Sequence, residues 1–105
     1  MRTLLLPELA DKTFVALKEA GASSYYQTTF QTVARQFIRY ATEKDAQTFS
    51  MDLGLQFLED HYSMSERIRE GKFCYQYLRS INAMAEYQQS GSVVLYLAKD
   101  MRNYV

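Results

Sequence analysis

Apolar residues recur every three or four positions along four stretches of this chain, which is the spacing of one face of an α-helix. The four stretches cover residues 7–20, about 24–41, about 50–62 and about 72–89. Polar residues fill the positions between, so each stretch is predicted to be an amphipathic helix with one buried face. The connections are short, which favours an all-α fold, a compact bundle of four antiparallel helices.

Residues that often begin or end helices flank these stretches. Pro7 suits an opening turn, where its missing N–H is no loss, and Gly21 can end the first helix. We also expect N-caps at Ser23 or Ser24 and at Ser50. The last helix is expected to end at Ser90-Gly91.

The predicted core faces follow the helical spacing. In the first helix they are Leu6, Leu9 or Ala10, Phe14 or Thr13, Leu17 and Ala20. In the second they are Tyr26, Phe30, Val33, Ala34, Phe37 and Ala41. In the third they are Leu53, Phe57 and Leu58, and in the fourth Phe73 or Cys74, Tyr77, Leu78, Ile81, Met84 and Ala85.

Three segments lack a clear helical pattern. The link 43–49 contains no Gly or Pro, so the helix ends beside it are poorly defined. Residues 62–71 are polar and are expected to form a loop or a frayed helical turn of low stability. Residues 93–97 are apolar and fit a short strand or a last helical turn, a possible short fifth element at the C-terminus.

Length and composition limit the class of protein. The chain has 105 residues, 48% of them hydrophobic, which is enough for one domain with a real core. Its single cysteine, Cys74, excludes an intramolecular disulfide and fits a reducing cytosol. The longest early apolar run, residues 4–6, is too short for a signal peptide, and no segment is long enough to span a membrane. We therefore expect a single cytoplasmic domain with no membrane partner.

Charge is distributed unevenly, although the formal net charge is zero. The second predicted helix carries Arg35 and Arg39 and no acid, whereas the third carries three acids and no Lys or Arg. Those acids are Asp52, Glu59 and Asp60. A polyanion could lie along the former helix and would be repelled by the latter. The alternative is that both are ordinary solvated helix surfaces.

Long hydrogen-bond donors line the outer sides of two predicted helices. On the second helix they are Gln27, Gln31, Arg35 and Arg39, and on the fourth Lys72, Gln76 and Arg79. Exposed tyrosines could add stacking on bases or contact with a protein, unless they are merely rim residues of the core. The expected exposed tyrosines are Tyr25, Tyr75 and Tyr96.

Catalytic chemistry has little support in the sequence. His61 is the only histidine, and no cysteine or second histidine lies at metal-ligand spacing from it. Cys74 has no histidine at motif distance and is expected to be a buried structural thiol. No Gly-rich phosphate loop is present. We expect no enzyme, no metal and no cofactor; a small metal- or ligand-binding bundle using His61 is a remote alternative.

The order of these blocks carries a family resemblance. Gly21 closes the first block, and Phe30, Ala34, Phe37 and Tyr40 follow Ser23 at the spacing of a second helix. Residues 49–54 precede Phe57-Leu58 and His61-Tyr62, and residues 77–84 precede Tyr87 and Gly91. Over roughly residues 6–100 the pattern resembles the N-terminal core-binding (SAM-like) domain of tyrosine recombinases, the phage integrase superfamily. Tyr26 stands where that family often has a threonine.

This resemblance implies a DNA-binding domain, residues 1–105, of a longer bacterial recombinase that integrates and recombines DNA. The catalytic domain would lie outside this chain, since His61 is followed by Tyr62-Ser63-Met64 and not by the family's His-x-x-Arg. In such proteins the second and fourth helices face duplex DNA. The parent would be nucleoid-associated and tetrameric on DNA, and the isolated domain a monomer.

The resemblance also suggests roles for the donor residues. The expected phosphate contacts are Arg35, Arg39, Lys72 and Arg79, and the expected groove contacts are Gln27, Thr28, Gln31 and Gln76. The competing prediction is a helical protein–protein interaction module that does not bind nucleic acid, which explains the neutral charge and the many aromatic residues equally well.

Overall fold

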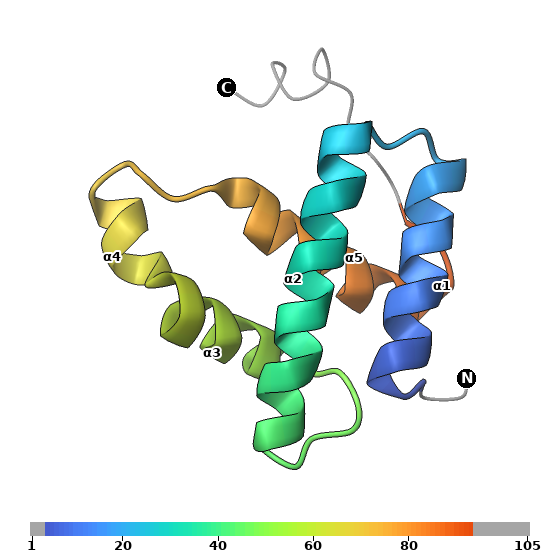
Figure 1. Ribbon diagram of the computed structural model, residues 1–105, viewed down its shortest axis with the longest axis horizontal. Coiled ribbons are helices and arrows are strands. Elements are labelled where there is room, and N and C mark those ends of the chain that lie inside the picture. Colours follow the sequence, from blue (N-terminus) through green and yellow to red (C-terminus); the bar gives the residue numbers. More distant parts are fainter. Residues whose placement is uncertain (1–3, 94–105) are drawn as a thin grey trace.

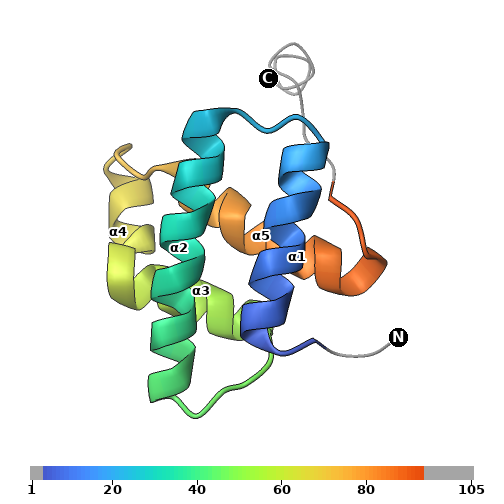
Figure 2. The same ribbon diagram turned by 45° about the vertical axis from the view of Figure 1, so that its right-hand side comes forward.

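Five helices make up residues 4–93, the part of the chain that this computed structural model describes (Figure 1). They are α1 (Leu6–Glu19), α2 (Ser24–Glu43), α3 (Met51–Tyr62), α4 (Met64–Arg69) and α5 (Tyr75–Ser90). The predicted all-α fold is confirmed. However, only α1 and α2 lie side by side as antiparallel neighbours; α5 crosses behind both at a steep angle (Figures 1 and 2). None of these helices combines the length and hydropathy that crossing a membrane requires.

The predicted N-caps and the first helix end are confirmed. The side chain of Ser23 accepts a hydrogen bond from the N–H of Tyr26, and that of Ser50 accepts one from the N–H of Leu53, each at 3.1 Å. At the end of α1, Gly21 adopts a left-handed conformation with φ of +92°, as this position of a helix end requires. These three helix ends are therefore set by local interactions of residues that can be recognised in the sequence.

The end of α2 has no glycine, and Asp45 takes the left-handed conformation instead, with φ of 60°. The N–H of Ala46 donates to the carbonyl of Ala41 at 2.8 Å, which closes the helix. Aspartate tolerates this conformation better than most residues do. The link then returns to the start of α1, where the N–H of Leu6 donates to the carbonyl of Gln47 at 3.0 Å.

Helix α4 occupies the segment that was expected to be a loop or a frayed turn. The carboxylate of Glu59, in α3, accepts hydrogen bonds from the N–H and the hydroxyl of Ser65, the latter at 2.6 Å. A side chain from the preceding helix therefore satisfies the first turn of α4, and none of the α4 residues is buried. The C-terminal prediction for 93–97 falls outside the described residues from position 94 onward.

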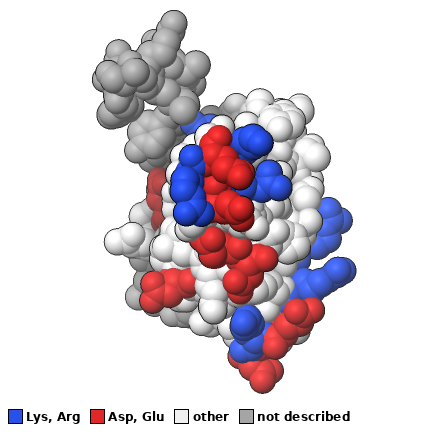
Figure 3. Space-filling view, turned by 90° about the vertical axis from the view of Figure 1, so that its left-hand side faces the viewer, with Lys and Arg blue, Asp and Glu red and all other residues white. Residues whose placement is uncertain are grey.

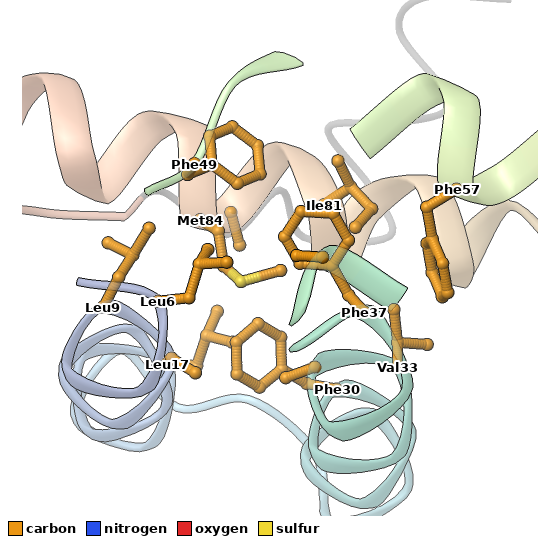
Figure 4. Packing of buried hydrophobic residues seen from close by; sticks show 14 of the residues in the cluster. Leu6, Leu9, Leu17, Phe30, Val33, Phe37, Phe49, Phe57, Ile81 and Met84 are labelled. Carbon is orange, nitrogen blue, oxygen red and sulfur yellow. The ribbon is translucent and has the colours of Figure 1, made fainter. Parts of the chain in front are cut away.

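The core fills the space between the α1–α2 pair and the α5–α3 pair (Figure 4). All six residues predicted for the core face of α2 are buried. In α1, Thr13 is buried and Phe14 is half-buried, while Ala20 is exposed because the helix ends before it. In α5, Ile81 and Met84 are fully buried. The other predicted α5 core residues are only half-buried: Tyr77, Leu78 and Ala85.

Helices α3 and α5 approach each other closely at Gly54. A Cβ atom placed on Gly54 would lie 2.6 Å from Cγ2 of Ile81, well inside van der Waals contact. Ile81 is fully buried and β-branched, so its side chain has little freedom to move aside. Glycine at position 54 therefore permits the packing of α3 on α5.

We predict that Gly54→Ala destabilises the protein by about 1–2 kcal/mol in urea unfolding. The overpacking, of about 1–3 kcal/mol, outweighs the gain of about 1 kcal/mol in helix propensity. In Gly54→Ala/Ile81→Leu, which lacks the clashing Cγ2, part of that loss should return. Gln56→Ala, at an exposed position of the same helix, is the control and should leave stability nearly unchanged. A stabilised Gly54→Ala would show that the two helices can separate freely.

Candidate nucleic-acid interface

The exposed side of α2 carries most of the predicted donor row. Thr28, Gln31, Arg35 and Arg39 are all exposed. Gln27 is half-buried, and its side-chain Nε2 donates to the carbonyl of Ala22 at 2.8 Å, so this amide is already used where α2 begins. Four of the five predicted α2 residues are therefore available to a ligand.

A groove of about 400 Å³ runs between α1 and α2 beside this row. Gln31 and Arg35 lie along it, and its apolar lining includes Phe14 and Phe30, whose rings stack with centroids 6.4 Å apart. Asp11 of α1 is the single acid among the residues that line it. The groove therefore brings Arg35 and Gln31 next to two aromatic residues.

The predicted residues near α5 are placed differently from expectation. Lys72 is exposed but precedes α5, which begins only at Tyr75. Gln76 and Arg79 are half-buried, and the positions that α5 exposes are Tyr75, Asn82, Gln89 and Ser90. The prediction that Lys72, Gln76 and Arg79 share one open helix face is thus wrong, because α5 turns that side toward its neighbours.

The half-buried Arg79 of α5 lies close enough to Tyr26 of α2 for its charge to act on the tyrosine hydroxyl. Burial raises the pKa of Tyr26, and the positive charge of Arg79 and a hydrogen bond with Ser80 partly oppose that shift. Both residues belong to α5, so this part of α5 packs on α2. The Arg79 side chain therefore belongs to the region where α5 packs on α2.

The face formed by α3 and α4 carries both signs of charge, with acidic groups in a central column and cations beside it (Figure 3). Two of the three acids of α3 have structural partners. Glu59 caps α4, and the carboxylate of Asp60 accepts a hydrogen bond from the hydroxyl of Tyr40 at 2.6 Å. Two of the three acids of α3 therefore take part in helix capping and helix packing.

Aromatic rings join α2, α3 and α5 next to this face. The ring of Phe57 contacts those of Tyr40 and His61, with centroids 5.5 and 5.2 Å apart. Tyr62 stacks on Tyr77 at 4.0 Å, and its hydroxyl donates to the side chain of Gln36. This cluster could not be predicted from the sequence, because its members come from three helices and meet only through packing.

Neither His61 nor Cys74 is part of a metal-binding group. Among residues 4–93, no three His, Cys, Asp or Glu side chains gather closely enough to hold an ion. His61 is exposed, and Cys74, which was expected to be buried, is only half-buried. Exposure is also confirmed for Tyr25 and Tyr75, while Tyr96 lies outside the described residues.

Comparison of this chain with protein-family models, curated proteins and solved structures finds no match. Inference about its function therefore rests on its own residues.

The hydrogen bond between Tyr40 and Asp60 predicts a pH effect. Partial burial, the hydrogen bond and the negative charge of Asp60 together raise the pKa of Tyr40 from 10.0 to about 12. Tyr40 is neutral in both states below about pH 10, and between about pH 10 and 12 only the unfolded chain ionises it. Its contribution to stability is therefore present below about pH 10 and is lost as pH rises through about 12.

This shift can be measured from the ultraviolet absorbance of tyrosinate during an alkaline titration. In Asp60→Asn, Tyr40 should ionise at lower pH, because the neighbouring negative charge is gone. Tyr62, whose pKa is also about 12, should titrate as before. Asp52→Asn, an exposed acid on the same helix, is the control. An unchanged titration in Asp60→Asn would contradict the assignment.

Proposed function

We propose that this chain is a DNA-binding domain, similar to the core-binding domain of a site-specific tyrosine recombinase, and that it contacts the duplex through α2. The observation that carries the proposal is the exposed row of Thr28, Gln31, Arg35 and Arg39 on a helix with no acid before Glu43. The order and spacing of the helical blocks, which resemble that family, support it as well. Under this proposal, reaction chemistry belongs to a catalytic domain outside this chain.

The spacing of the two arginines suits a phosphate backbone. Arg35 and Arg39 lie one helical turn apart, a rise of about 6 Å. Two successive steps along one DNA strand cover about 7 Å of the duplex axis. Both guanidinium groups can therefore reach phosphates of the same strand, which would fix the position of the domain on the duplex.

The neutral donors of the row would then face the edges of the bases. The Gln31 amide and the Thr28 hydroxyl each offer a donor and an acceptor, the groups that base edges in the major groove recognise. Lys72 lies apart from this row, in a hollow of its own. We assign half-buried Gln76 and Arg79 to the packing of α5 and not to first contact with DNA.

We predict that Arg35→Gln/Arg39→Gln weakens binding to duplex DNA at low salt by about tenfold. The slope of log affinity against log salt should fall by about two, because each lost phosphate contact removes about one unit. The measurement is fluorescence anisotropy of a labelled duplex over a range of salt concentrations. Both arginines are exposed, so the variant should keep its thermal stability.

Lys12→Gln is the matched control. Lys12 is an exposed cation on α1 that does not line the groove beside the α2 row. Its loss removes one positive charge and should leave the salt slope unchanged. If the control lowers affinity as much as the arginine variant does, binding is diffuse attraction, and the interface on α2 is rejected.

The second candidate function is a protein-interaction module, which two exposed aromatic rings favour. Tyr25 is 66% exposed and Tyr75 is 55% exposed, and rings this accessible are typical of interface cores. The same titration separates the two functions. An interaction module would not bind duplex at any salt concentration, whereas the proposed domain should bind at low salt.

A further inference from the structure

A hollow of about 290 Å³ lies where α3, α4 and α5 meet. Three nitrogen-bearing side chains line it: His61 from the end of α3, Arg67 from α4 and Lys72 from the turn before α5. Its remaining lining adds the Ser63 side chain, the Cys74 side chain and two tyrosine rings, but no carboxylate. Such a volume is at the lower end of small-ligand sites, and the donors that surround it favour an anion.

The turn after α4 brings the backbones of two of these residues, Arg67 and Lys72, together. Gly71 adopts φ of +72° and donates its N–H to the carbonyl of Ile68 at 3.0 Å. The N–H of Lys72 donates to the carbonyl of Arg67 at 2.8 Å. These two bonds form a Schellman motif, which ties the backbone of Lys72 directly to that of Arg67. The turn therefore holds the backbones of the two cationic residues together.

The nearest acids of α3 are occupied elsewhere. The carboxylate of Glu59 is bound to Ser65, and that of Asp60 accepts from the hydroxyl of Tyr40. Glu66 of α4 and Glu70, which directly follows α4, do not line the hollow. Thus no carboxylate is placed inside the hollow to neutralise its cations.

The lining also includes two stacked tyrosine rings and the start of α5. Tyr62 and Tyr77 stack at 4.0 Å, and the Tyr62 hydroxyl is held by Gln36 of α2. At the start of α5, the side chain of Cys74 forms no capping hydrogen bond and the first turn holds no acid. The positive end of the α5 dipole is therefore not offset by its own residues.

We propose that this hollow binds a phosphate group, as inorganic phosphate or a small phosphomonoester. Arg67 and Lys72 supply the charge, and the Ser63 hydroxyl and the His61 ring supply further donors. The site is separate from the α2 row, with which it shares no lining residue. It therefore does not depend on the proposed function.

His61 provides a direct probe, because it is the only histidine in the chain and its ring protons give a unique NMR signal. Inorganic phosphate is titrated at constant pH and ionic strength, with chloride as the balancing anion. We expect a saturable shift of the His61 signal. Arg67→Gln and Lys72→Gln should each weaken the apparent affinity roughly fivefold, as expected when an exposed charge-assisted contact is lost.

Arg69→Gln is the matched control, since it removes an exposed cation of α4 that does not line the hollow. It should leave the phosphate affinity unchanged. A shift that does not saturate, that chloride alone reproduces, or that Arg69→Gln weakens as much as Arg67→Gln overturns the proposal. All three altered side chains are exposed, so the variants should remain folded.

A second arm identifies the source of the phosphate group. Duplex DNA is added to phosphate-saturated protein carrying Arg35→Gln/Arg39→Gln, so that the α2 row does not dominate binding. Displacement of phosphate from the His61 signal identifies a DNA backbone phosphate as the ligand. Retention of phosphate identifies a free anion. Failure of DNA binding through α2 leaves either result intact, so the two proposals stand or fall separately.

Discussion

The burial of α5 against three other helices is the constraint on which the rest of this structure depends. α5 contacts α1, α2 and α3, and its residues Ile81 and Met84 are fully buried among them. Gly54 allows α3 to approach α5 closely enough for this packing. Once Tyr26 and Phe37 of α2 face the core, the helical period leaves Arg35 and Arg39 facing solvent. The candidate interface on α2 is therefore a consequence of how the core packs.

The helices that bury an apolar face could be predicted from the sequence, whereas α4, which buries none of its residues, could not. The core face of α2 followed from spacing alone, and Ser23 and Ser50 marked helix starts by their side-chain chemistry. Helix α4 buries none of its residues, so it has no apolar stripe to detect. Its first turn is satisfied by Glu59, six positions before the Ser65 that it binds. Such a contact depends on how the chain turns between two helices.

The same distinction separates the two parts of the predicted site. Predicting the α2 row required only the helical period within a single helix. Four of its five residues are exposed in the structure. The α5 set failed because Lys72 precedes the helix and because Gln76 and Arg79 are half-buried where α5 packs among its neighbours. The hollow at Arg67 and Lys72 was not predictable for a similar reason. It requires the left-handed turn at Gly71 and the side of α3 that carries His61.

Zero net charge is compatible with two separate sites for anions on one small domain. The Debye length at physiological salt is about 8 Å, whereas the molecule measures 38 × 33 × 23 Å. Exposed acids on one face are therefore largely screened from cations on another. What an anion meets at either site is set by the side chains within about one Debye length of it. A neutral chain lacks long-range steering, however, so its selectivity must come from contact geometry. The row on α2 follows the regular period of one helix, and two backbone hydrogen bonds close the turn between Arg67 and Lys72.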